Sequence, residues 1–420
     1  MKIALVCPYN MLDRPGGVPQ VVMHLHEGLK KKGHVVKVIT QRPSSFEGQA
    51  PEDYILFGIT RTFKISGFGT EGNWGMPADG EEIAKILEQE QFDVINFHEP
   101  WLPMLAWQML KHSKAAHVGT FHANLVDTAA GKSWTSSIFT PYGRPLLKKM
   151  HLFTATSPAA SGMLISRANM KSPHEKSLIE NLKYIPCGVE LSVYKPVKKR
   201  LPLNGPNTKT IVYVGRLEKR KGVDWLLPAF AELQKEMPNV HLIIAGSGIR
   251  ANRLREYVNM ENIKNVAFPG YVTDEEKRRL LCNADLACFP SSYGEGFGIV
   301  LLEAMAVGTP LVAGSNLGYK NVMTGHGRIG LVDPEATADF ANRLAVMLSD
   351  NDLRKLMVSW ELADVKKYDY PKIVAQYEAA FKEAIILKNK SARSKSSAGN
   401  NNGKKRRKII RRLFVRRHAG

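Results

Sequence analysis

Short runs of β-branched and other apolar residues alternate with helix-length amphipathic stretches through nearly the whole chain. In such an alternation each helix returns the chain to the starting edge, so consecutive strands pair in parallel and helices cover both faces of the sheet. Residues 18–32 show the helical part of the pattern, because their apolar side chains recur at helical spacing and Pro19 falls in a first turn. The strands predicted on this basis are Ile3–Cys7, Val35–Thr40, Val94–Phe97, His117–Thr120, Thr210–Val214, Val240–Ala245, Leu286–Phe289 and Leu311–Ala313.

The alternation is interrupted once, at residues 195–208, which are rich in Pro, Asn and Lys, and it restarts with a strand. A chain of 420 residues with 44% hydrophobic residues is long enough to bury two cores. We therefore predict an α/β protein with two Rossmann-like, doubly wound parallel-sheet domains facing a central cleft. The predicted parts are residues 1–187, residues 188–370, a helix at 371–387 that packs back on the first domain, and a flexible basic tail at 388–420.

The net charge of +20 is concentrated in this tail. Residues 388–420 contain thirteen Lys and Arg and no Asp or Glu, so the rest of the chain has a net charge of only +7. A basic tail can bind nucleic acid by neutralising phosphates, and a polyanion-binding protein is one alternative function. Residues 1–387 contain no recognised nucleic-acid module, so we expect no specific nucleic-acid partner.

Residues 404–417 interleave cations with apolar side chains. A helix of this composition can lie on an anionic membrane surface, and a solvated tail is the alternative. No apolar run approaches the ~18 residues that span a bilayer. The four cysteines are scattered without a CxxC pair, which suggests neither a disulfide framework nor a zinc site and fits the cytoplasm. We expect a cytoplasmic protein, peripheral at the inner face of the plasma membrane if the tail binds lipid.

The first candidate site is the segment VYVGRLEKRKG at residues 212–222. Arg216 and Lys221 follow the end of a predicted strand, and the carboxyl ends of parallel strands face the crevice where α/β sheets bind ligands. Arg can bind phosphate in a bidentate manner, and Lys supplies a compact charge. Lys219 and Arg220 lie between them, so a set of solvated charges is the alternative interpretation.

The second candidate site is the segment 289–314, where a strand leads into a glycine-rich turn and a helix beginning near Ile299. Glycines allow backbone N–H groups to approach a phosphate or a sugar, and a helix N-terminus favours an anion. Glu295 in the loop can bind hydroxyls of a transferred sugar, and Glu303, about one turn into the helix, those of a ribose.

Five motifs together resemble one family. Glu295 and Glu303 form an E-x7-E pair, and GRLEKRKG is similar to a phosphate-binding GRxxxxKG element. The segments CPYNMLDRPGGVPQVV, NFHEP and GTFHA resemble the corresponding parts of phosphatidylinositol mannosyltransferases. The chain therefore resembles the retaining GT-B glycosyltransferases of the family 4 type over nearly all of residues 1–387, and the resemblance implies the GT-B fold.

The resemblance also implies roles for individual residues. His122 and Glu295 are implied to be catalytic, and Tyr9 to lie near the acceptor. Donor-binding roles are implied for Gly16, Gly17, Arg216, Lys221, Gly296, Phe297, Gly298, Ile299 and Glu303.

The implied activity is transfer of a hexose, with retention of configuration, from a nucleotide diphosphate sugar to a lipid or glycan acceptor. GDP-mannose is the first expectation and a UDP-sugar the second. Charged side chains can stabilise the leaving diphosphate, so we expect neither a metal nor a cofactor. The alternatives are a UDP-sugar-dependent transferase with a soluble acceptor, an epimerase or phosphorylase of the same fold, and a catalytically silent relative.

The chain departs from the phosphatidylinositol mannosyltransferases in three places. Residues 79–91 are acidic where those enzymes have a basic cluster, and residues 66–77 have no counterpart of their inositol-phosphate arginine. Cys187 replaces the Asn of their NGV turn.

Overall fold

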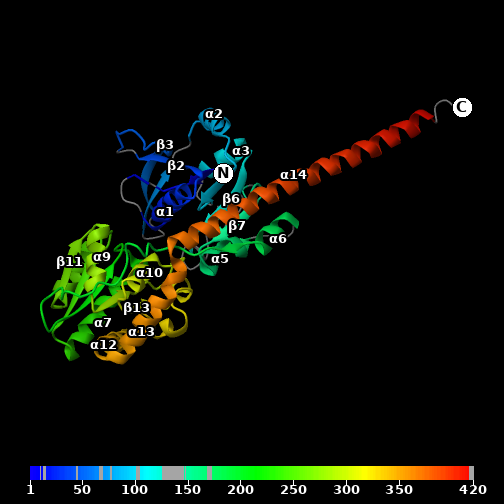
Figure 1. Cartoon of the computed structure of the whole chain (residues 1–420). Coiled ribbons are helices and arrows are strands. Elements are labelled where there is room, and N and C mark those ends of the chain that lie inside the picture. The colour runs from blue at the N-terminus through cyan, green and yellow to red at the C-terminus, as the bar shows by residue number, and fades with distance from the viewer. Residues whose placement is uncertain are drawn as a thin grey trace.

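The protein consists of two α/β halves in a computed structural model that describes residues 1–9, 11–12, 16–43, 46–65, 70–75, 78–100, 105–124, 146, 148–167 and 173–415. Each half contains one sheet with helices on both faces (Figure 1). All eight predicted strands are present, and their ends differ from the predicted ends by no more than three residues. The prediction of a two-sheet α/β protein is therefore confirmed.

The sheet of the first half has the strand order β4-β3-β2-β1-β5-β6-β7-β8. Neighbouring strands are parallel except for β3 and β4, which pair antiparallel at the edge. The strand order reverses at β1, between β2 and β5, and in open α/β sheets ligands bind beside such a switch point. The strands are β1 Lys2–Val6, β2 Val35–Pro43, β3 Tyr54–Ile65, β4 Thr70–Gly75, β5 Val94–His98, β6 Ala116–Phe121, β7 Leu152–Ala155 and β8 Lys183–Tyr184.

The sheet of the second half has the order β11-β10-β9-β12-β13-β14 and is parallel throughout. This is the strand order of a dinucleotide-binding fold, with its switch point between β9 and β12. The strands are β9 Lys209–Val214, β10 Val240–Ala245, β11 Val266–Gly270, β12 Leu286–Phe289, β13 Leu311–Gly314 and β14 Leu331–Val332.

The helices are amphipathic and pack their apolar sides on the sheets. Helix α1 buries Val21, Val22, Leu25 and Leu29, the residues that gave its helical pattern. The helices of the first half are α1 Gly17–Lys31, α2 Gly80–Glu90, α3 Leu105–His112, α5 Pro158–Arg167 and α6 Pro173–Glu180. Those of the second half are α7 Val223–Glu236, α8 Ala251–Met260, α9 Asp274–Asn283, α10 Ile299–Ala306, α11 Leu317–Lys320, α12 Thr337–Ser349 and α13 Asn351–Asp364.

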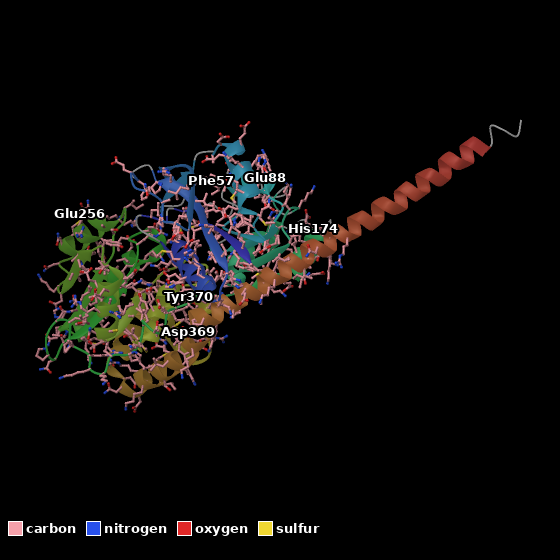
Figure 2. The ribbon with its side chains drawn as sticks, turned by 45° about the horizontal axis from the view of Figure 1, so that its top comes forward. Phe57, Glu88, His174, Glu256, Asp369 and Tyr370 are labelled. Carbon is pink, nitrogen blue, oxygen red and sulfur yellow. The ribbon has the colours of Figure 1, made fainter. Side chains whose placement is uncertain are left out.

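The chain crosses between the halves twice, and the two crossings lie side by side. The Val189 N–H donates to the Tyr368 carbonyl at 2.9 Å, and the Tyr370 N–H donates to the Val189 carbonyl at 3.3 Å. Tyr370 stacks on His24 of the first half with 4.0 Å between ring centroids. Asp369 and Tyr370 mark this junction in Figure 2. The two segments therefore form a hydrogen-bonded hinge.

The last helix, α14 Tyr370–Val415, returns to the first half. It packs against α1 and the strands β5, β6 and β7, where it buries Ile373, Val374, Tyr377 and Phe381. Residues 388–415 continue this helix, although we expected a flexible tail there (Figure 1). No proline follows Pro371 to interrupt it. Within the described residues, no helix combines the length and the apolar character needed to cross a membrane.

Candidate active site

The loops at the carboxyl ends of the two sheets touch each other. A Cβ added to Gly296, in the loop before α10, would lie 1.7 Å from the His122 carbonyl oxygen after β6. A Cβ on Gly17, at the start of α1, would lie 3.5 Å from Cδ1 of Ile299. Gly16 has open space around it. The predicted glycine loop, His122 and the start of α10 are therefore brought to one interface between the halves.

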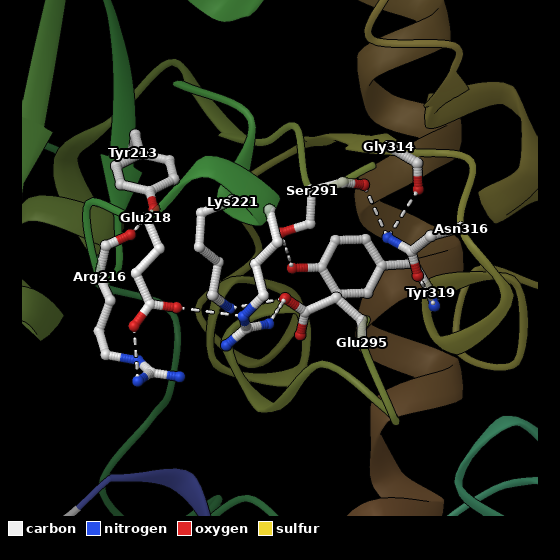
Figure 3. A network of polar contacts seen from close by, with 10 residues as sticks. Tyr213, Arg216, Glu218, Lys221, Ser291, Glu295, Gly314, Asn316 and Tyr319 are labelled. Atoms are coloured by element: carbon white, nitrogen blue, oxygen red, sulfur yellow. Dashed lines mark hydrogen bonds and ion pairs between the residues drawn. The ribbon is translucent and has the colours of Figure 1, made fainter. Parts of the chain in front are cut away.

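Glu295 is the centre of a buried charge cluster in the second half (Figure 3). Its Oε1 lies 2.7 Å from Nη1 of Arg220 and 2.8 Å from Nζ of Lys221. The side chain is only 8% exposed, and burial alone would raise its pKa. The charges of Lys221 and Arg220 outweigh that effect and lower the pKa of Glu295 to about 2. The carboxylate therefore stays ionised in the absence of ligand.

The cluster contains a different arginine from the one that the sequence predicted. We singled out Arg216 and Lys221, but Arg220 contacts Glu295 directly. Arg216 is 56% exposed and pairs with Glu218 at 2.7 Å, and Glu218 in turn accepts from Nε of Arg220 at 3.1 Å. Arg216 therefore lies at the solvent end of one charge network, with Lys221 at the buried end.

The backbone around the cluster requires glycine at two positions. Gly222 has φ of +74°, and a Cβ there would lie 1.9 Å from the Pro290 carbonyl oxygen. Gly298, just before α10, has φ of +112° and faces the ring of Tyr319. The Tyr319 hydroxyl donates to Oγ of Ser291 at 3.2 Å. The glycines thus let the Glu295 loop approach both the cation loop and α11.

Glu303 does not share partners with Glu295. Its Oε1 lies 2.6 Å from Nζ of Lys277 on α9 and accepts from the Tyr194 hydroxyl at 3.2 Å. Burial opposes the charge on Lys277, but the adjacent Glu303 raises its pKa and keeps it protonated. The E-x7-E residues therefore form two separate polar sites on one loop–helix unit, and neither Lys277 nor Tyr194 was predicted.

The first half contains a buried hydrogen-bonded chain that ends at His122. Oγ1 of Thr120 donates to Oδ1 of Asn96 at 2.7 Å, Nδ2 of Asn96 lies 3.0 Å from Nε2 of His98, and Nδ1 of His98 lies 2.8 Å from Nε2 of His122. Burial lowers the pKa of His122 to about 3 and that of His98 well below 6.5, so both rings are neutral.

This chain determines the tautomer of His122. An amide nitrogen can only donate, so Nε2 of His98 accepts and its proton is on Nδ1. That proton is then donated to Nε2 of His122. The proton of His122 is therefore on Nδ1, and the residue is an uncharged hydrogen-bond donor.

Glu99 holds the loop that contains His122. Its Oε1 accepts from the backbone N–H groups of His122 at 2.7 Å and Ala123 at 2.6 Å. Its φ of +49° is unusual for a residue with a side chain. Burial raises the pKa of Glu99 to about 7, although the two N–H donors lower it. The NFHEP motif suggested this segment, but no role for His98 or Glu99 was predicted.

Tyr9 lies close to charged groups of both halves. Its backbone carbonyl accepts from Oγ1 of Thr40 at 2.9 Å. Burial raises the pKa of its hydroxyl, Glu99 raises it further, and Arg216 and Arg220 of the second half lower it. Tyr9 therefore lies near the interface of the halves, and its role at the acceptor stays a prediction.

Some predicted segments fall outside the described residues, namely 10 and 13–15 of the N-terminal motif, 66–69 and 76–77 of the segment 66–77, and 416–420 of the tail. In the part of the chain that the structure describes, no three His, Cys, Asp or Glu side chains are grouped to hold a metal ion.

Solved structures with the same two-sheet architecture include a sucrose-phosphate synthase and a glycosyltransferase from Rickettsia africae. Sucrose-phosphate synthase from Thermosynechococcus elongatus has a TM-score of 0.73 at 21% identity and covers 92% of this chain and 99% of its own. Anabaena HepE in complex with UDP and glucose has a TM-score of 0.70 at 20% identity and covers 91% and 99%. The protein therefore has the GT-B fold.

The sequence comparisons identify the family. A family model described as "Glycosyltransferase Family 4" matches residues 15–193, and one described as "Glycosyl transferases group 1" matches residues 197–359. Phosphatidyl-myo-inositol mannosyltransferase of Mycobacterium tuberculosis is 32% identical over 382 residues, which are 90% of this chain and 95% of that protein. This chain belongs to the family 4-like glycosyltransferases, and its mannosyltransferase relatives span nearly its whole length.

Proposed function

We propose that the protein transfers mannose from GDP-mannose to a lipid acceptor at the cytoplasmic face of the membrane, with retention of configuration and without a metal ion. The observation that carries the proposal is the buried cluster of Glu295, Arg220 and Lys221 beside the start of α10, opposite His122. The cations and the helix N-terminus can bind the diphosphate of the sugar nucleotide. The uncharged N–H group of His122 and the carboxylate of Glu295 can form hydrogen bonds with hydroxyls of the sugar.

In this proposal the two halves have different tasks. Breaking the bond between sugar and phosphate places negative charge on the leaving diphosphate, which Lys221, Arg220 and Arg216 stabilise. Such preorganised charge typically contributes several kcal/mol to transition-state stabilisation. The Nδ1–H of His122 donates to a hydroxyl of the sugar, and Glu295 accepts from another. Closure of the halves excludes water and limits hydrolysis of the donor.

The lipid acceptor is supported by the relatives that are named phosphatidyl-myo-inositol mannosyltransferase. In this chain α2 carries Glu81, Glu82, Glu88 and Glu90, whereas α14 continues into the basic residues 404–415. We propose that the basic end of α14, rather than α2, binds the anionic membrane. Each basic residue near such a surface contributes about 1 kcal/mol.

A UDP-sugar is the second candidate donor, because the HepE structures that share this fold contain UDP. A thermal-shift series with GDP, GDP-mannose, UDP and UDP-glucose separates the two, since a ligand at 100 times its Kd stabilises the folded protein by about 2.7 kcal/mol. Stabilisation by GDP and GDP-mannose alone supports GDP-mannose as the donor. Stabilisation by UDP and UDP-glucose alone refutes GDP-mannose as the donor.

Transfer itself is tested with the stabilising sugar nucleotide and vesicles that contain phosphatidylinositol or phosphatidylglycerol, with product anomers read by proton NMR. An inverted product contradicts retention, and loss of activity with a chelator that is reversed by a divalent ion contradicts metal independence.

Sedimentation of the full chain and of residues 1–387 with anionic vesicles tests the tail. Equal binding by the two proteins would remove its proposed role.

A further inference from the structure

Ser157 connects the first half directly to the donor loop of the second. It follows β7 and immediately precedes α5, which begins with Pro158. Its Oγ accepts from the backbone N–H of Ala160 at 3.2 Å, so it is the N-cap of this helix. The same Oγ donates to the carbonyl of Gly296, 139 residues further along the chain.

This contact uses the hydroxyl proton, which the cap leaves available. A serine hydroxyl has one proton, and the N-cap interaction uses only a lone pair, so the proton is donated to Gly296. Ser157 is only 2% exposed, and an unpaired hydroxyl at such a position is costly. The interaction exists only when the two halves are as close as they are here, because its two atoms belong to different halves of the protein.

The carbonyl that Ser157 holds belongs to the peptide that follows Glu295 and Gly296. A peptide bond is planar and trans, so fixing this carbonyl also fixes the N–H of Phe297, which points to the opposite side. The ring of Phe297 packs edge-on against Tyr368 of the hinge with 5.7 Å between centroids. The loop is thereby held at its carbonyl by the first half and at its next side chain by the hinge.

We infer that Ser157 is a positioning residue for glycosyl transfer, which orients the Gly296 loop and its neighbour Glu295 when the halves close. The inference deepens the proposed function and rests on it. The nucleoside diphosphate binds the cations of the second half, so its affinity does not depend on Ser157. The rate of transfer depends on Ser157, because it requires the sugar-binding part of the loop to be oriented.

Four variants separate positioning from helix capping. Ser157→Thr keeps both interactions of the hydroxyl. Ser157→Gly keeps most of the cap, since Gly caps only slightly less well, but cannot donate. Ser157→Ala loses both. Ser161→Ala is the matched control, because Ser161 lies on the same helix and its buried hydroxyl bonds to Pro158 and Tyr184 rather than to the donor loop.

We expect Ser157→Gly and Ser157→Ala to lower kcat by about tenfold, the size of one neutral hydrogen bond. The Kd for the nucleoside diphosphate, measured by calorimetry, stays within twofold of wild type, and Ser157→Thr and Ser161→Ala keep at least half of wild-type kcat. A Ser157→Gly enzyme with wild-type kcat would overturn the inference. So would a Ser161→Ala enzyme that loses as much kcat as Ser157→Ala, because the effect would then be that of the helix.

A second measurement does not need transfer. Hydrogen exchange of the loop 294–298 is measured while the protein is bound to the nucleoside diphosphate that stabilises it. We expect exchange about tenfold faster in Ser157→Gly than in wild type and unchanged in Ser161→Ala. Equal exchange in wild type and Ser157→Gly overturns the inference even if transfer is never detected. Failure of the wild-type enzyme to transfer any hexose instead refutes the proposed function.

Discussion

The two halves each bury one carboxylate at the interface, and they treat it in opposite ways. Glu99 of the first half is 4% exposed and accepts only from backbone N–H groups, so burial raises its pKa to about 7. Glu295 of the second half is equally buried, but Lys221 and Arg220 lower its pKa to about 2. Equal burial thus gives a partly neutral group in one half and a permanent charge in the other.

The surroundings follow the same division. Near Glu99 the polar groups are the neutral rings of His98 and His122, which are oriented by amide and hydroxyl groups. Near Glu295 they are cations. The first half is therefore suited to uncharged hydroxyl groups and the second to phosphate charge. The division of the site is electrostatic as well as structural.

The comparison predicts its largest effect at Lys221. Replacement by Met removes a buried positive charge of the second half while roughly keeping the length of the side chain. We expect the rate of transfer to fall by about 1,000-fold, as when a preorganised transition-state contact is removed. Lys221→Arg, which keeps the charge, is the control and should retain more activity. A Lys221→Met enzyme within fivefold of wild type would show that charge in the second half is not needed.

The next effect is on stability and separates the two arginines. Arg220→Met removes one cation from the buried Glu295 and Glu218, which keep Lys221 and Arg216 as partners. We expect a loss of about 3 kcal/mol, the upper end of the range for hydrogen bonds between charged groups. Arg216→Met removes an exposed partner and should change the free energy of unfolding by less than about 1 kcal/mol. Urea denaturation measures both. Equal losses would mean that Arg216 and Arg220 contribute equally to stability.

A third prediction concerns a variant that exchanges the donors and acceptors in the hydrogen-bonded chain of Asn96, His98 and His122. In Asn96→Asp the carboxylate can only accept, so Nε2 of His98 must donate to it, and Nε2 of His122 must donate to His98. The Nδ1 of His122 then becomes an acceptor. We expect kcat/KM to fall about 30-fold and the imidazole nitrogen-15 shifts of His122 to exchange. His117, which bonds to Ser113 and Lys149 instead, is the control in the same spectrum.

The smallest effect is the pH dependence of Glu99. Its pKa of about 7 in the folded protein exceeds the ordinary 4.5, so between these values the folded protein holds a proton that the unfolded chain has lost. The free energy of unfolding therefore decreases as the pH rises through this window, by about 1–3 kcal/mol. Glu99→Gln, which keeps an acceptor oxygen, should lack this decrease. Parallel pH curves for the two proteins would show that Glu99 does not titrate there.

The sequence predicted those parts of the molecule that depend on local patterns. The hydrophobic periodicity and the alternation of strands and helices predicted eight of the strands. The spacing of glycines and acidic residues predicted that Glu295 lies in a loop and that α10 begins at Ile299. Strands β3, β4, β7, β8, β11 and β14 were not predicted. Of these, β8 and β14 have two residues each, which are too few to show a period. The helical continuation of α14 was missed because Ser, Asn and Gly between residues 391 and 403 are typical of linkers.

The missed site residues are those that depend on tertiary contacts. Arg220 occupies a variable position of the phosphate-binding element, and only its distance of 2.7 Å from Glu295, 75 residues away, distinguishes it from Lys219. Ser157 occupies an ordinary N-cap position, and nothing local indicates Gly296 as its partner. Lys277 likewise belongs to a helix that shows no motif. Motifs give the elements of a site, whereas the pairing between elements is a property of the fold.

The path of α14 determines when the first half can finish folding during synthesis. Its buried residues Ile373, Val374, Tyr377 and Phe381 complete the packing against α1 and strands β5, β6 and β7, all of which precede Val189. A ribosome that adds 5–20 residues per second makes them roughly 10–40 s later than the last strand of the first sheet. Until then α1 and strands β5–β7 present an uncovered apolar surface. The core of the first half can therefore be completed only after the second half has been made.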